Sequence, residues 1–167
     1  ALVYHPRNSS AQAEAGQIQA LLELAKAAVF TARTDSEELS QRMTAGEFDA
    51  VLALGGDGTM LRAGHLAAPL GIPVLGINLG RFGFLMQLTR TDWKETLPRL
   101  FTGDFKIENR MMLQAEHLRD EKRLGIYQVI NDVVVCRGTT VRPIRLHARV
   151  DGYNLASYVA DGLIAAT

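Results

Sequence analysis

Residues 48–59 read FDAVLALGGDGT, an apolar run that passes directly into a glycine-rich turn. An apolar run of this length that ends in glycines is typical of a buried strand in a parallel sheet. Three glycines surround one acid, Asp57, and glycine allows the main chain to approach a ligand closely. The stretch therefore predicts a strand with a candidate site at its carboxyl end, although such turns also occur for structural reasons alone.

Strand and helix patterns alternate on both sides of this stretch. The apolar spacing predicts strands at 2–4, 29–31, 48–54 and 72–77, and helices over 11–27, 37–43 and 60–68, with a further helix over 93–101. Ser36 is a suitable cap for the second helix, and Pro98 limits the last one. Such alternation favours a parallel sheet with helices on both faces, whose ligands bind at the carboxyl ends of the strands. The turns 55–59 and 78–84 both follow such ends.

The pattern changes from about residue 105 onward. Short runs alternate apolar and polar positions or are rich in β-branched residues, which is typical of antiparallel strands. Asp151 and Gly152 between two such runs form a strong signal for a two-residue hairpin. The sequence thus predicts two domains: residues 1–104 as an α/β domain with a parallel sheet, and residues 105–167 as part of a largely antiparallel all-β domain.

The composition excludes several classes of protein. The 167 residues are 47% hydrophobic and 22% charged, and the 18 basic residues balance the 18 acidic ones, so nucleic acid is not expected as a partner. The single cysteine, Cys136, excludes a disulfide framework and cysteine-rich zinc motifs. No apolar run approaches the roughly 20 residues of a membrane span, and the first residues, ALVYHP, lack the basic segment and cleavage site of a signal peptide. We expect a soluble, cytoplasmic protein. The missing initial methionine and the end at Thr167 in mid-pattern suggest a fragment of a longer chain.

Four acid- or glycine-bearing stretches remain as candidate sites after the common motifs are excluded. The sequence lacks a P-loop, a dinucleotide-binding G-x-G-x-x-G after a strand and a G-x-S-x-G nucleophile elbow, and its scattered histidines lack metal-ligand spacing. Asn131 can read a nucleobase edge and Asp132 can accept from ribose hydroxyls, or the pair forms a bend between strands. Asp161 and Gly162 likewise form either a site or a hairpin turn.

Taken together, four stretches resemble the NAD kinase family in order and spacing. They are GGDGT at 55–59, LGINLGRFGFL at 75–85, NDVVV at 131–135 and DGLIAAT at 161–167. GGDGT alone is shared with diacylglycerol, sphingosine and related sugar kinases, whereas the four stretches together are specific. The resemblance covers nearly the whole chain.

The resemblance implies an enzyme that transfers the terminal phosphoryl group of ATP, or of polyphosphate, to the 2′-hydroxyl of the adenosine ribose of NAD, giving NADP. It also implies that residues 1–104, which carry GGDGT, form a nucleotide-binding domain and that residues 105–167 are part of an NAD-binding β domain. A divalent metal, usually Mg²⁺, and a homodimer or homotetramer are implied as well. Small-molecule nucleotides are the expected partners, with neither nucleic acid nor membrane. Two alternatives remain: a lipid or sphingoid-base kinase of the same superfamily, or a non-catalytic dinucleotide-binding sensor.

The resemblance carries specific roles onto this sequence. Asp57 becomes the catalytic acid that accepts the proton of the attacking hydroxyl, and Phe84 lies against the adenine. Asn131 and Asp132 bind the nucleotide, and Asp161 contacts the nicotinamide half. The other residues with an implied or plausible binding role are Gly56, Gly58, Thr59, Arg62 and Arg142. No residue is assigned as a metal ligand.

Two positions differ from the pattern of the NAD kinases: Val159 stands where many members carry a basic residue, and Phe82 stands where leucine is usual. Residues 60–64 read MLRAG, whereas lipid kinases usually continue with Glu-Val-x-Asn-Gly. This difference from the lipid kinases counts against a lipid substrate. The family continues beyond Thr167 with a Pro-Thr/Ser-Gly-Ser-Thr-Ala-Tyr segment that completes the adenine site. We therefore expect the β domain to be incomplete in this chain, and the isolated 167 residues to be inactive and poorly soluble.

Overall fold

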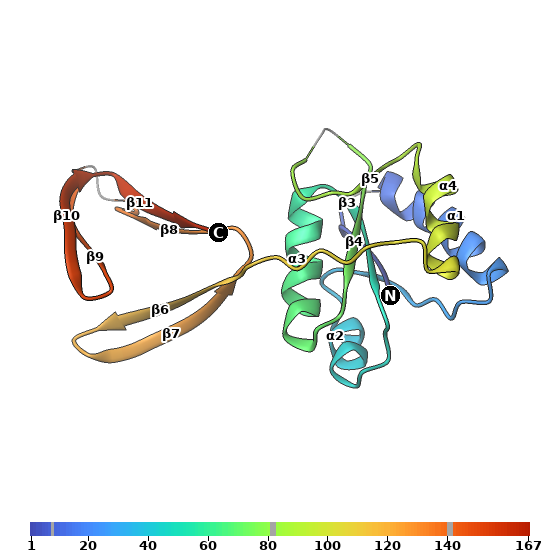
Figure 1. Cartoon of the computed structure of the whole chain (residues 1–167), viewed down its shortest axis with the longest axis horizontal. Coiled ribbons are helices and arrows are strands. Elements are labelled where there is room, and N and C mark those ends of the chain that lie inside the picture. Colours follow the sequence, from blue (N-terminus) through green and yellow to red (C-terminus); the bar gives the residue numbers. More distant parts are fainter. Residues whose placement is uncertain (8, 81–82, 140–141) are drawn as a thin grey trace. The chain divides into compact units, whose positions relative to one another are not determined.

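The computed structural model describes residues 1–7, 9–80, 83–139 and 142–167. For Ser9 it describes the backbone alone. Arg81 and Phe82, in the second glycine-rich turn, lie outside the described residues. The chain forms two compact units, Ala1–Asn109 and Arg110–Thr167, which are shown in Figure 1. Among the described residues, no helix combines the length and apolar character needed to cross a bilayer.

The first unit contains a five-stranded parallel sheet. Its strands are β1 (Leu2–Tyr4), β2 (Thr31–Arg33), β3 (Val51–Gly55), β4 (Val74–Asn78) and β5 (Leu88–Thr89). Their order in the sheet is β2-β1-β3-β4-β5, and every neighbouring pair is parallel. The parallel sheet predicted from the alternating pattern is confirmed, with β3 at its centre.

Helices cover both faces of this sheet. They are α1 (Ser9–Leu24), α2 (Glu37–Thr44), α3 (Asp57–Ala67) and α4 (Trp93–Thr96), with 3₁₀ turns at Ala68–Leu70 and Leu97–Thr102. Successive strand residues point to opposite faces, so Leu52 and Leu54 pack with α1 and α4, whereas Val51 and Ala53 pack with α2 and α3. Figure 1 shows α1 and α4 on the opposite side of the strands from α3.

Three elements differ from the sequence prediction in ways that matter locally. The second strand spans Thr31–Arg33 and not 29–31, which places Arg33 at the carboxyl end of the strand. The helix expected from residue 60 begins at Asp57, because Gly56 already adopts the extended N-cap conformation. The last helix has one α-helical turn and continues as a 3₁₀ helix, since Pro98 cannot donate the backbone hydrogen bond of an α-helix.

The second unit consists of antiparallel strand pairs. Its strands are β6 (Leu113–Arg119), β7 (Lys122–Val129), β8 (Asp132–Cys136), β9 (Ile144–Val150), β10 (Tyr153–Ala160) and β11 (Gly162–Ala166). β6 pairs with β7, β9 with β10, and β8 with β11. The predicted antiparallel character is confirmed. All the fully buried hydrophobic residues of the described chain lie in the first unit.

Two hairpins in this unit have two-residue turns with positive φ. Asp151 (φ 51°) and Gly152 (φ 83°) connect β9 to β10, which confirms the predicted hairpin. Asp120 (φ 49°) and Glu121 (φ 65°) connect β6 to β7 in the same way. The sequence did not signal the second turn, because glutamate is not a residue that this turn normally selects.

A buried carboxylate joins the first helix to the end of the sheet. Glu14 on α1 is 5% exposed and accepts a hydrogen bond from Trp93 Nε1 at 2.9 Å. Its other oxygen accepts from Arg90 Nε at 2.9 Å. The indole of Trp93 is 1% exposed, so its N–H has no access to water. Glu14 therefore satisfies a buried donor and an arginine together.

We expect Glu14→Ala to lower the free energy of unfolding by about 1–3 kcal/mol, the usual cost of a buried donor left without an acceptor. Urea denaturation of the full-length protein measures this change. Glu23→Ala is the matched control, because Glu23 lies on the same helix but is exposed and its side chain accepts a hydrogen bond from Gln19 Nε2 at the surface. The control is expected to stay within about 0.5 kcal/mol. Equal losses in both variants would contradict a role for the Trp93 contact.

Candidate active site

The turn after β3 is positioned by the core. All five residues of β3 are buried, and the chain leaves the strand at Gly55 and enters α3 through the N-cap Gly56. Asp57 is therefore the first residue of α3 and stands at the carboxyl end of the central strand. A negative side chain is favoured there, because the first turn of a helix carries free N–H groups and the positive end of the helix dipole.

The carboxylate of Asp57 is held by the loop that follows β4. Its Oδ2 accepts a hydrogen bond from the backbone N–H of Phe84 at 3.0 Å, and its Oδ1 accepts from Leu85 N–H at 3.1 Å. Two bonds to the main chain set the orientation of the carboxylate. An ionised carboxylate has about four acceptor positions, so two remain for a further donor such as a substrate hydroxyl.

Gly83 allows this contact to form. A Cβ at position 83 would lie 2.7 Å from Asp57 Cγ and closer still to Oδ1. Any other residue would therefore displace either the carboxylate or the loop. Gly83 was not among the candidate residues from the sequence, although it belongs to the turn 78–84 and to the stretch 75–85 that resembles the family. Only the structure shows that it faces Asp57.

Gly56 and Gly58, the glycines singled out in the sequence, differ from Gly83. A Cβ added to either would meet no atom within 4 Å. Packing within the described chain therefore does not require glycine at these two positions. Their predicted role, which is to leave room for a ligand beside the main chain, is compatible with this free space and stays a prediction.

The loop that follows β4 is anchored to that strand by the side chains of Gln87 and Asn78. Gln87 accepts from Gly76 N–H at 2.7 Å through Oε1 and donates to the carbonyl of Leu85 at 2.8 Å. Asn78 Oδ1 accepts from Gly80 N–H at 2.9 Å, which tightens the start of the loop. Gln87 thus supports the segment that holds Asp57. Glutamine has no distinctive pattern in a sequence, and no signal pointed to it.

The remaining candidates on α3 and its loop face different surroundings. Thr59 is 3% exposed and occupies the space where Gly55 would otherwise carry a Cβ, so its side chain packs under the turn. Arg62 is exposed on α3, one turn beyond Thr59. Phe84 is 97% exposed next to its backbone contact with Asp57. An exposed ring at this place is available for stacking on a planar ligand.

The other four candidates lie in the second unit. Asn131 is half-buried just before β8, and its carbonyl accepts from Thr167 N–H at 2.9 Å. Asp132 is exposed at the first position of β8. Arg142 is exposed in the segment between β8 and β9. Asp161, between β10 and β11, has a 73% exposed side chain and pairs with Arg137 at 3.3 Å.

The β8–β11 pairing separates two of these candidates. Gly162 is opposite Cys136, whereas Ala166 is opposite Asp132. Asp161 thus lies at one end of the ladder and Asp132 at the other, at least four residues or about 13 Å apart along the strands. Since β11 pairs with β8 and not with β10, Asp161 and Gly162 do not form the hairpin turn considered as an alternative. The structure does not bring Asp161 into contact with Asp132.

The first unit is a doubly wound α/β domain of the ligand-binding type. It has the strand order of that class, and its central strand ends in a glycine-rich turn with an acid held in place. The family model described as "ATP-NAD kinase N-terminal domain" matches residues 3–105. The chain belongs to the NAD kinase family.

Individual relatives agree with this assignment. The chain is 46% identical over 132 residues to an NAD kinase of Heliobacterium modesticaldum, covering 79% of this chain and 46% of the relative. It is 46% identical over 119 residues to an NAD kinase of Moorella thermoacetica, covering 71% and 38%. The chain therefore spans less than half the length of these curated relatives.

A solved structure shows the same fold. The crystal structure of yeast NADH kinase complexed with NADH matches with a TM-score of 0.80 at 20% identity, over 99% of this chain and 57% of that one. The match extends over both units, so the α/β architecture and the antiparallel strand pairs are shared with that protein.

Proposed function

We propose that the full-length protein is an NAD kinase, which transfers a phosphoryl group from ATP or polyphosphate to the 2′-hydroxyl of the adenosine ribose of NAD. Membership of the family supports the proposal, and one observation carries it. The carboxylate of Asp57 is oriented by the N–H groups of Phe84 and Leu85 and keeps free acceptor positions.

The chemistry assigned to Asp57 is that of a general base. The ribose 2′-oxygen forms a bond to the terminal phosphorus of the donor while the bond from that phosphorus to its bridging oxygen breaks. The hydroxyl proton passes to Asp57, and the shortened donor leaves with the bridging electron pair. A positioned base contributes because the oxygen becomes a better nucleophile as its proton departs.

The family resemblance supports the binding roles proposed for the remaining candidates of the full-length protein. The exposed ring of Phe84 lies against the adenine, and Asn131 and Asp132 bind the nucleotide. Asp161 contacts the nicotinamide half of the dinucleotide, and Arg142 binds a phosphate or the nucleotide. Gly56 and Gly58 leave room for the ribose and the donor phosphates.

A divalent metal, Mg²⁺, fits this site as a companion of the donor phosphates. Among the described residues no group of three histidine, cysteine or acidic side chains is placed to hold a metal. Mg²⁺ in kinases usually keeps several waters and is bound through one or two carboxylates and the substrate phosphates. In the full-length protein the metal would be held mainly by the donor phosphates and waters, and it would neutralise charge on the transferring group.

We further infer that the protein works in the cytoplasm as a homodimer or homotetramer, with small-molecule nucleotides as its partners. A lipid or sphingoid-base substrate is disfavoured by the family and by the MLRAG continuation at 60–64. Size-exclusion chromatography with light scattering measures the assembly.

The decisive experiment incubates the full-length protein with NAD or NADH, Mg²⁺, and either ATP or polyphosphate, and follows the phosphorylated dinucleotide. Formation of NADP from NAD with at least one donor is the expected result, and it should stop on addition of EDTA. Phosphorylation of diacylglycerol or sphingosine in place of NAD would reject the proposal. Dinucleotide binding without turnover under all four conditions would favour the sensor.

A further inference from the structure

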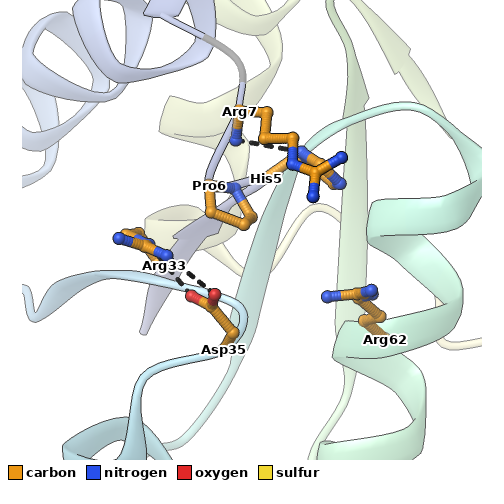
Figure 2. Close-up of a pocket in the computed structure, with 6 residues that line it drawn as sticks. All are labelled: His5, Pro6, Arg7, Arg33, Asp35 and Arg62. Atoms are coloured by element: carbon orange, nitrogen blue, oxygen red, sulfur yellow. Dashed lines mark hydrogen bonds and ion pairs between the residues drawn. The ribbon is translucent and has the colours of Figure 1, made fainter.

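The first unit contains a hollow of about 380 Å³ that is separate from the hydrogen bonds of Asp57. Figure 2 shows its six lining residues, which come from the ends of β1 and β2 and from α3. They are His5, Pro6, Arg7, Arg33, Asp35 and Arg62. Of these, only Arg62 was a candidate from the sequence.

The topology explains why a ligand site can form at this place. β1 ends at Tyr4 and β2 at Arg33, so the hollow lies beyond the carboxyl ends of both strands. In the order β2-β1-β3-β4-β5, the chain adds β2 on one side of β1 and then β3, β4 and β5 on the other side. The direction in which strands are added therefore reverses between β1 and β3. Open α/β sheets bind ligands at such a switch point, where the loops diverge and leave a crevice.

The lining is positively charged. It contains three guanidinium groups and one carboxylate, Asp35, which accepts two hydrogen bonds from Arg33 at 2.9 and 2.7 Å. Hydrogen bonding to Arg33 lowers the pKa of Asp35, so the carboxylate remains ionised at neutral pH. Among the residues that the structure describes, none of the ion pairs includes Arg7 or Arg62, although the charge of Arg62 also acts on Asp35. With three guanidinium groups and one carboxylate, the lining keeps an excess of positive charge that can bind an anion.

The donors in the hollow suit phosphate oxygens. A guanidinium group presents several N–H donors in a plane that matches phosphate geometry. His5 Nδ1 accepts from the backbone N–H of Arg7 at 3.1 Å, so in the neutral ring the proton is on Nε2, which can donate. Arg62 lies five residues after Asp57 on α3, about 7.5 Å along the helix axis. A triphosphate can extend over that distance.

We propose that this hollow binds the phosphate chain of the phosphoryl donor through Arg7, Arg33 and Arg62, with His5 as an additional hydrogen-bond donor. The inference rests on the proposed function for the identity of the ligand. ATP and inorganic polyphosphate share the recognised chemistry, a chain of linked phosphates, and the site recognises that chain and not the base.

The test is calorimetric titration of the full-length protein with tripolyphosphate, ATP, AMP and NAD at low ionic strength. Arg7→Ala and Arg33→Ala are each expected to lower the affinity for tripolyphosphate and for ATP about tenfold, the loss typical of one charge-assisted hydrogen-bonded contact. NAD affinity should change less than about twofold, because the proposal assigns these arginines to the phosphate chain of the donor and not to NAD. Both arginines are exposed, so the variants should keep the wild-type melting temperature.

Arg99→Ala is the matched control. Arg99 pairs with Asp104 at 2.8 Å and its side chain is 56% exposed, close to the values for Arg33, which pairs with Asp35 at 2.7 Å and is 55% exposed. This control should bind tripolyphosphate like the wild type. Asp35→Asn tests the sign of the effect: loss of the acidic group that Asp35 supplies among the described residues of the lining should tighten tripolyphosphate binding at least about threefold, since a negative charge that repels phosphate is removed.

The outcomes separate the site from the overall function. Losses in Arg7→Ala and Arg33→Ala no larger than in Arg99→Ala would overturn the proposal, as would a selective loss of NAD affinity. An equal loss of affinity for ATP and for tripolyphosphate supports recognition of the phosphate chain. A loss of affinity for ATP and AMP with unchanged binding of tripolyphosphate would overturn it. If the wild type formed no NADP but bound tripolyphosphate through these arginines, the proposed function would fail and the phosphate-chain site would stand.

Discussion

Asp57→Asn in the full-length protein is expected to lower the rate of NADP formation about 100- to 10,000-fold, the usual contribution of a positioned general base. The asparagine amide keeps the size of the carboxylate but cannot take up the proton of the ribose hydroxyl. NAD affinity should change little, because other residues are proposed to make the adenine and nicotinamide contacts. Steady-state kinetics and a separate NAD titration measure the two quantities.

The same substitution also removes an acceptor inside the protein. One of the N–H groups of Phe84 and Leu85 then faces the amide NH₂ and loses its hydrogen bond. The melting temperature should be recorded so that a loss of folded protein is not mistaken for a loss of chemistry. Asp49→Asn is the control, since Asp49 is exposed shortly before the same strand. Wild-type turnover by Asp57→Asn would reject its assignment as the base.

Gly83→Ala is expected to have the second largest effect, about a hundredfold loss in turnover, although position 83 carries no reactive group. Its new methyl would lie 2.7 Å from Asp57 Cγ, so the carboxylate or the loop must move. A displacement of about 1 Å in a reacting group can cost this much in rate. Gly16→Ala, on an exposed part of α1 with no atom within 4 Å of the added Cβ, should leave turnover unchanged.

The double variant tests whether Gly83 acts through Asp57. When two positions act through one group, the effects of their substitutions do not add. Asp57→Asn combined with Gly83→Ala should therefore be no slower than Asp57→Asn alone. Fully additive losses would show that Gly83 contributes in some other way, and an active Gly83→Ala variant would show that the Asp57 contact is dispensable.

Local patterns were sufficient for most elements of the fold. The apolar run before Gly55 predicted the buried central strand, and strand and helix periods alternating around it predicted a parallel sheet. Ser36 accepts from Leu39 N–H at the start of α2, as its cap position indicated. These predictions succeeded because burial on both faces and helix capping act within a few residues of the chain.

The limits of some elements and one turn could not be predicted from local sequence patterns. The start of α3 at Asp57 depends on the conformation of Gly56, and the turn at Asp120 and Glu121 lacks the residues that such turns usually contain. The contact of Asp57 with Phe84 and Leu85 joins residues 27 and 28 positions apart. No local pattern contains such a contact, because it forms only when β3 and β4 pair and direct their loops to the same edge.

The sequence by itself determined the parallel sheet, the antiparallel second half and, through its resemblance to the NAD kinases, Asp57 as the acid of interest. Tertiary structure decided which groups surround that acid: Gly83 makes room for it, and Gln87 steadies the loop that binds it. It also gathered Arg7, Arg33 and Arg62 from three separate segments. The physical reason is the strand order, because neighbouring parallel strands bring distant segments together at their carboxyl ends.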